Sequence, residues 1–183
     1  MKMYKLVIVL FVVGLMAGLT YAQEAPKQTD PLGPGDHTRT LMMGEQKRTY
    51  LVHVPKKYDP KTPTPVVLAL HGAAMDGSMM VWFSGLNKKS DEAGFVVVYS
   101  SGTGVGPFRT WNAGGFKGKM AEGKADDVAF IGKLLDDLAT VAKVDEKRVY
   151  AQWYLLCRLS HFAGFAARDL RRTRGSTLLR GFP

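Results

Sequence analysis

The chain of 183 residues carries a formal net charge of +9, is 46% hydrophobic and contains one cysteine, Cys157. A single cysteine excludes an internal disulfide framework. Six arginines and one aspartate in residues 152–183 account for five of the positive charges, so the basic character gathers at the end of the chain. A nucleic-acid-binding domain carries basic residues across a face of the fold, and this distribution does not favour one.

The first 22 residues have the composition of a secretory signal peptide. Lys2 and Lys5 give a positive start, residues 6–19 are apolar, and Thr20 and Ala22 place small side chains before a cleavage site. We expect cleavage after Ala22 and a secreted protein, either extracellular or periplasmic. A membrane anchor is the alternative, but the apolar run is short for a bilayer span, so we expect no stable membrane span after cleavage.

The remaining chain divides into three parts. Residues 23–36 are rich in Pro, Gly and Asp and are expected to form a flexible leader. Residues 37–151 form the expected domain. Residues 152–183 differ in kind, because all 15 lysines of the chain precede residue 152 and the six arginines that follow are accompanied by no lysine. A change of reading frame in the gene would produce such a switch.

The domain alternates strand and helix patterns along the chain. In order these are strands at 38–43 and 48–54 joined as a hairpin, a buried strand at 66–70, a helix at 79–93, a buried strand at 95–99, a helix at 126–143, and a strand beginning at 148–151. A hairpin followed by alternating strands and helices predicts an α/β fold with a mainly parallel sheet and flanking helices.

The strongest local signal is LHGAAMDG at 70–77, which follows a buried strand directly. His71 and Gly72, followed by small residues, allow backbone N–H groups to point into a site. In α/β-hydrolases the loop after this strand supplies one N–H group of the oxyanion hole. Ala73 and Ala74 are the candidates for that donor, and His71 and Gly72 are candidates for supporting the loop. A plain strand-to-helix turn is the alternative.

Other polar residues are weaker candidates for catalysis. Ser100 and Ser101 lie in a Gly-rich loop after a strand, but they lack the flanking pattern of a nucleophile and are more typical of a turn. Asp126 and Asp127 are expected to be acids at a helix N-terminus rather than a metal site or an acid–base pair.

Trp111 and Asn112 are candidates for the border of a substrate cleft, with buried packing as the alternative. Cys157 lies among leucines, and we expect a buried or incidental thiol rather than a nucleophile. His37 and His53 are explained by exposed or strand positions, and His161 lies in the tail.

Residues 36–151 resemble a known family. The matching stretches are RTYLVHVP (48–55), PTPVVLALHGAAMDG (63–77), GFVVVYSSGTG (94–104), TWNAG (110–114), ADDVAFIGKLLDDL (125–138) and VDEKRVYA (144–151). In order and spacing they resemble the secreted polyhydroxybutyrate depolymerase and feruloyl esterase-like family of α/β-hydrolases. The resemblance implies the N-terminal portion of an α/β-hydrolase fold and hydrolysis of carboxylic esters by a Ser-His-Asp triad. It also implies no metal and no organic cofactor.

The tail departs from the family where catalysis would begin. In the family the strand matching RVYA (148–151) runs into a G-x-S-x-G elbow, but residues 152–156 read QWYLL. The elbow needs glycines because side chains there clash in the strained turn. The family's acid and histidine come later still, so no catalytic residue is assigned. We expect an inactive, frameshifted or truncated esterase whose fold is interrupted at the nucleophile strand.

Two further hypotheses stay open. The Arg-rich tail with Trp153 and Tyr154 is compatible with a non-catalytic fragment that binds anionic surfaces. The third hypothesis is an enzyme with a different nucleophile, which a fluorophosphonate probe would label. The partner implied for the intact family is a polyester or aromatic ester substrate. The sequence predicts no nucleic-acid partner and leaves the oligomeric state open.

Overall fold

The computed structural model describes residues 29–72, 75–106, 108–112 and 126–153. In chain order the elements are β1 (Gly35–Met43), β2 (Gln46–Val54), β3 (Thr64–Leu70), α1 (Gly77–Ser84), α2 (Leu86–Ala93), β4 (Val96–Ser100), β5 (Thr103–Val105), β6 (Phe108–Thr110), α3 (Asp127–Val141) and β7 (Val144–Trp153). Five of these strands form a sheet that lies between the helices.

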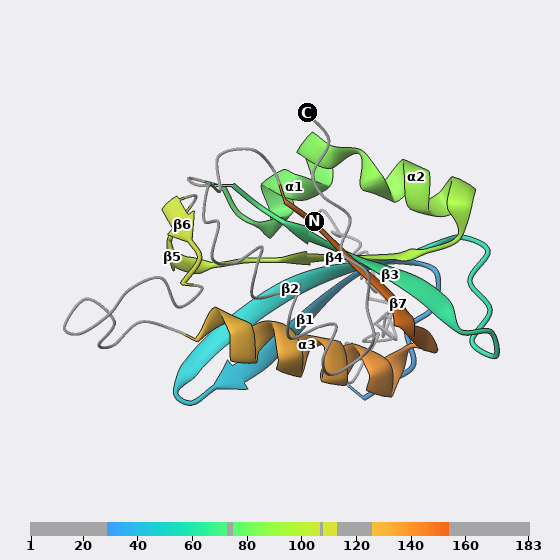
Figure 1. Cartoon of the computed structure of the whole chain (residues 1–183), viewed down its shortest axis with the longest axis horizontal. Coiled ribbons are helices and arrows are strands. Elements are labelled where there is room, and N and C mark those ends of the chain that lie inside the picture. The colour runs from blue at the N-terminus through green and yellow to red at the C-terminus, as the bar shows by residue number, and fades with distance from the viewer. Residues whose placement is uncertain (1–28, 73–74, 107, 113–125, 154–183) are drawn as a thin grey trace, which may run out of the picture.

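Five strands form one sheet in the order β1-β2-β4-β3-β7 (Figure 1). Strands β4, β3 and β7 run parallel, and Val66 of β3 pairs with Val96 on one side and Val149 on the other. The β1–β2 hairpin extends this parallel part through antiparallel pairing of β2 with β4. Helices α1 and α2 lie on one face of the sheet and α3 lies on the other (Figure 1). The predicted α/β fold with flanking helices is confirmed.

The central strands are apolar on both faces, as expected for parallel strands covered from two sides. All five residues of β4 are buried. The smaller core, against α1 and α2, consists of Ala69, Met80, Val97 and Tyr99. The larger core, on the α3 face, includes Tyr50, Val52, Val66, Leu68, Val96, Val98, Trp111, Phe130, Leu134, Leu138 and Val149.

Helix α3 forms where its apolar spacing predicts a helix. The side chain of Asp126 caps its start and accepts hydrogen bonds from the N–H groups of Val128 and Ala129 at 3.1 and 2.9 Å. A cap of this kind contributes about 1 kcal/mol to stability. The face that packs on the sheet consists of Phe130, Ile131, Leu134, Leu135, Leu138 and Val141.

The expectation of one helix over 79–93 is wrong. The structure has two helices, α1 and α2, that meet at Gly85, which adopts a left-handed conformation with φ of 62°. A residue in this conformation cannot continue a right-handed helix, and glycine adopts it without a steric penalty. Only Gly77 and Met80 of α1 and Ser90 of α2 are buried, so no buried apolar stripe marks where one helix ends and the next begins.

Three further features differ from the sequence expectation. The β1–β2 hairpin turns through Gly44 and Glu45 alone, since Met43 pairs with Gln46. Part of the loop after β4 forms a two-stranded sheet, β5–β6. Before β1, Leu32 is buried and its N–H group donates to Val141 O at 2.8 Å. Among the described residues, no helix has the length and apolar character needed to cross a bilayer.

Candidate active site

The parallel strands end together at one edge of the sheet. Leu70 of β3 pairs with Ser100 of β4 and with Trp153 of β7. His71 follows β3 directly, and Ser101 follows β4. Ligand sites of open α/β sheets lie beyond the carboxyl ends of such strands. The HG motif therefore lies at the edge of the sheet where a site is expected.

The imidazole of His71 is fully buried and both of its nitrogens are engaged. Nε2 accepts a hydrogen bond from the N–H group of Gly102 at 2.8 Å, and Nδ1 lies 2.7 Å from Gly72 O. An amide donor at Nε2 and a carbonyl acceptor at Nδ1 are satisfied together by the neutral ring with its proton on Nδ1. Burial lowers the pKa of His71 and so favours the same neutral form. This arrangement holds the loop and leaves neither nitrogen to act as a base.

Trp111 packs against His71. Its indole N–H group donates to His71 O at 2.9 Å, and the two ring centroids are 4.8 Å apart at an interplanar angle of 33°. Its side chain is only 3% exposed. Of the two roles considered for Trp111, cleft border or buried packing, its contacts correspond to buried packing.

Gly102 and Gly77 lie where side chains do not fit. A Cβ atom at Gly102 would lie 2.2 Å from Thr110 O, far inside contact distance, and one at Gly77 would lie 2.9 Å from Tyr99 O. The N–H group of Gly77 donates to Ser101 Oγ at 3.0 Å. Glycine at these two positions therefore lets the segment after β3 approach the segment after β4.

Ser100 and Ser101, considered above as nucleophiles, have other surroundings. Ser100 is fully buried, and its Oγ has no hydrogen-bond partner in the part of the chain that the structure describes. Ser101 Oγ accepts a hydrogen bond from the N–H group of Gly77. A serine nucleophile needs an adjacent base, and the contacts of these hydroxyl groups supply none.

Asp126 and Asp127 have different roles. Asp126 caps α3, as an acid at a helix N-terminus does, but the carboxylate of Asp127 is fully buried. One of its oxygens lies 2.7 Å from Arg48 Nη2, and the other accepts the N–H group of Asn112. Desolvation raises the pKa of Asp127 above its ordinary value despite these two donors.

Arg48 was not singled out by sequence reasoning. It shares one face of β2 with Tyr50, Val52 and Val54, all of which are buried, so the period-two pattern of the strand was the available signal. Its guanidinium carbon stands 4.0 Å from the centroid of the Phe130 ring. Besides Asp127, Nη2 donates to Ser101 O at 2.8 Å.

A second arginine–aspartate pair connects the hairpin to α3. Arg39 of β1 donates to both carboxylate oxygens of Asp137, at 2.7 and 3.0 Å, and to the hydroxyl group of Tyr50 at 3.0 Å. The Tyr50 hydroxyl group in turn donates to Asp137. Burial is the largest cause of the raised pKa of Tyr50, and the neighbouring Asp137 adds to it. The tyrosine therefore stays a neutral hydrogen-bond donor.

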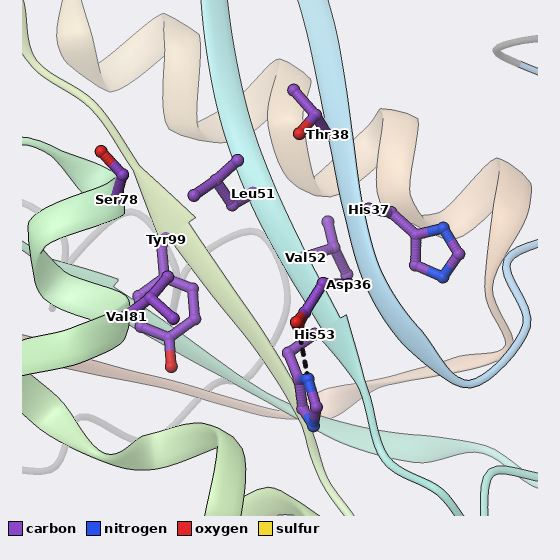
Figure 2. A pocket seen from close by; sticks show the side chains of 9 residues that line it. All are labelled: Asp36, His37, Thr38, Leu51, Val52, His53, Ser78, Val81 and Tyr99. Carbon is purple, nitrogen blue, oxygen red and sulfur yellow. Dashed lines mark hydrogen bonds and ion pairs between the residues drawn. The ribbon is translucent and has the colours of Figure 1, made fainter. Parts of the chain in front are cut away.

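A pocket of about 280 Å³ lies where β1, β2, β4 and α1 meet (Figure 2). It is lined by Asp36, His37, Thr38, Leu51, Val52, His53, Ser78, Val81 and Tyr99. His53 Nδ1 lies 2.7 Å from Asp36 Oδ1, and His53 Nε2 lies 3.3 Å from Asp91 Oδ1. Among the described residues, no group of three or more His, Cys, Asp or Glu side chains is arranged to hold a metal ion.

Several sequence candidates fall outside the described residues. These include Ala73 and Ala74, the proposed oxyanion donors, together with Cys157 and His161. Strand β7 is described as far as Trp153, and Gln152 pairs with Ala69 in regular parallel register. The backbone at Gln152 and Trp153 is thus extended strand, at positions where the family pattern would begin its elbow.

No family model matches the chain. A curated protein with the name "Putative esterase NocK", from Nocardia uniformis subsp. tsuyamanensis, is 29% identical over 132 residues, which cover 69% of this chain and 36% of NocK. The chain therefore spans well under half the length of this relative.

Solved hydrolase structures share the fold. An S-formylglutathione hydrolase from Agrobacterium tumefaciens superimposes with a TM-score of 0.58 at 16% identity, over 73% of this chain and 53% of that protein. An acetyl xylan esterase from Aspergillus awamori gives 0.52 at 14% identity, over 79% and 52%. The chain thus has an α/β-hydrolase fold in part, equivalent to about half of these structures. The predicted fold class is confirmed, and the resemblance to esterases extends over about 70% of the chain.

Proposed function

We propose that this chain carries the oxyanion-loop half of a secreted serine esterase, of the polyhydroxybutyrate depolymerase or feruloyl esterase type, and that it does not hydrolyse esters by itself. The motif LHGAAMDG and the similarity to NocK support the esterase class. The sequence QWYLL at 152–156 supports the lack of activity, because it has no serine and none of the elbow glycines.

The observation that carries the proposal is the fixed neutral His71 at the end of β3. Its ring accepts from Gly102 and contacts Gly72 O, so the backbone is held directly before the two alanines proposed as donors. Stabilisation of an oxyanion requires donors that are oriented in advance, because reorganisation during the reaction would cost much of the gain. The hydrogen bonds of His71 supply such a rigid support for the loop that follows β3.

The substrate class is an ester of a carboxylic acid, either a polyester or an aromatic ester. An intact enzyme would attack the ester carbonyl with a serine placed after β7, and the negative oxygen would be held by N–H groups that include the one after Gly72. The signal-like segment 1–22 supports export of the protein, with cleavage after Ala22.

The full purified chain tests the proposed inactivity. With p-nitrophenyl butyrate and a feruloyl ester as substrates, we expect release no faster than in buffer, and no labelling by a fluorophosphonate probe. A burst of p-nitrophenol, or labelling of any serine, would show an alternative nucleophile. Reading the gene in all three frames from the codon for Arg148 is the genetic counterpart. We expect a neighbouring frame to contain G-x-S-x-G soon after Ala151, followed by an Asp and a His.

A further inference from the structure

We propose that Arg48 and Asp127 are positioning residues for His71 and Gly77, the two ends of the oxyanion segment 71–77, which they orient through Ser101 and Gly102. The two residues after β4, Ser101 and Gly102, are called the clamp below. The inference deepens the proposed function, on which its catalytic meaning rests. Only the described ends of the segment are involved, and how firmly they are held can be measured without turnover.

The clamp holds both described ends of the segment. At the start, the N–H group of Gly102 donates to His71 Nε2 at 2.8 Å. At the end, Ser101 Oγ accepts from the N–H group of Gly77 at 3.0 Å. Two consecutive residues therefore fix two points that lie six residues apart in the chain. A shift of the clamp would move both ends together.

Arg48 fixes the position of the clamp. Its Nη2 donates to Ser101 O at 2.8 Å, so a group from the hairpin holds the backbone immediately after β4. The guanidinium is 4% exposed and packs over the Phe130 ring. A planar guanidinium held by a ring and a carboxylate has little freedom to rotate, and the direction of its N–H groups is therefore defined.

Asp127 is connected to His71 indirectly, through two chains of hydrogen bonds. Through Arg48 it supports the clamp, which contacts the imidazole from the Gly102 side. Through the N–H group of Asn112 it holds the residue next to Trp111, whose indole donates to His71 O. One buried carboxylate thus connects β2, α3 and both segments that contact His71.

A comparison within the molecule separates this role from a purely structural one. The Arg39–Asp137 pair also joins the hairpin to α3 at 2.7 Å, but its guanidinium is shared with the Tyr50 hydroxyl group rather than with the clamp. If arginine–aspartate pairs only attach α3 to the sheet, loss of either pair will affect the segment equally. If Arg48 and Asp127 position it, only their loss will.

Amide hydrogen exchange on the full-length chain tests the proposal. The readouts are the amides of Gly102 and Gly77, each expressed relative to the core amide of Leu68 in the same variant. In Asp127→Asn we expect both amides to exchange about tenfold faster relative to Leu68, the effect of weakening one charge-assisted hydrogen bond. In the matched control Asp137→Asn the ratio is expected to stay as in the original chain. Asp127→Asn keeps the shape of the side chain, and Arg48→Met is the second variant if the first does not fold.

The nitrogen NMR shifts of the His71 ring give an independent readout of its tautomer. We expect a single Nδ1–H form in the original chain and in Asp137→Asn, and a mixture of tautomers in Asp127→Asn. The variants are compared at one constant pH, because the charged groups Asp76, Arg109 and Asp127 lie near His71. Unchanged exchange ratios in the Asp127 and Arg48 variants, or equal changes in the Asp137 control, would overturn the proposal. Because no substrate is involved, failure of the esterase proposal leaves this result intact and distinguishable.

Discussion

The two arginine–aspartate pairs of this protein join the same hairpin to the same helix, yet their surroundings differ. Arg48 and Asp127 are both buried, with side-chain exposures of 4% and 0%, whereas Asp137 is 19% exposed beside Arg39. In the first pair, Arg48 also donates a hydrogen bond to a backbone carbonyl at the edge of the sheet, that of Ser101. In the second pair, Asp137 accepts a hydrogen bond from the Tyr50 hydroxyl group. The same pair of residue types therefore supports a candidate site at one end of α3 and packing nearer the other.

The largest expected difference between the two regions is in global stability. Asp127→Ala leaves the buried Arg48 without its carboxylate, and we expect a loss of about 3–5 kcal/mol. Asp137→Ala should cost about 2 kcal/mol, because water reaches that site more easily. Urea unfolding of the two variants measures both losses. Equal losses, or a larger loss for Asp137→Ala, would contradict the distinction between the pairs.

Two glycine substitutions should change stability in opposite directions. Gly102→Ala forces a Cβ atom to within 2.2 Å of Thr110 O, and we expect destabilisation of about 1–3 kcal/mol. Gly132→Ala, in α3, meets nothing within 4 Å and should stabilise by about 0.5–1 kcal/mol, since alanine favours the helix. Thermal unfolding measures both. A Gly102→Ala protein as stable as the original would show that the clamp can move without cost.

Trp111→Phe tests the hydrogen bond from the Trp111 indole to His71 O. Phenylalanine keeps a ring beside the imidazole but loses the N–H group that donates to His71 O. We expect a loss of about 1–2 kcal/mol, the usual cost of a buried acceptor left without its donor. Denaturant unfolding of this variant is the measurement, with Trp82→Phe on the exposed surface as the matched control. Similar effects of the two changes would contradict the importance of the contact.

The smallest expected effect is a pH dependence that comes from His71. Its pKa is lowered in the folded state by burial, so the unfolded chain binds more protons between the folded value and the ordinary value near 6.5. Stability should therefore fall as the pH decreases from 7 through that window. In His71→Gln this contribution should disappear, which unfolding at pH 7 and pH 5.5 would detect. An unchanged pH slope in the variant would mean that His71 does not contribute it.

Much of the secondary structure of the domain could be predicted from its apolar patterns, because β4 is buried along its whole length and α3 buries a continuous apolar face. The break at Gly85 could not, since the left-handed conformation that ends α1 is a property of one residue. The strand after residue 147 was also recognised, and its course as far as Trp153 emerged only from its pairing with β3.

The candidate site was predicted in part. The HG motif identified His71 through its place after a buried strand, but its partner Gly102 lies 31 residues away in sequence. Arg48 and Asp127 are 79 residues apart, and a charged residue on a strand is ordinarily taken as exposed. The sequence also shows two adjacent aspartates at the start of α3. Only the rotation of the helix against the sheet decides that Asp126 caps it and Asp127 points inward.

A hybrid enzyme tests most directly whether this chain is one half of an esterase fold. Residues 29–151 of this chain would replace the corresponding first half of a feruloyl esterase, which then supplies the G-x-S-x-G elbow, the acid and the histidine. We expect the hybrid to hydrolyse p-nitrophenyl butyrate, and a matched hybrid with the nucleophilic serine changed to alanine not to. A hybrid that unfolds cooperatively yet hydrolyses no ester would contradict the central claim. So would one that cannot fold, because the claim is that both halves belong to one fold.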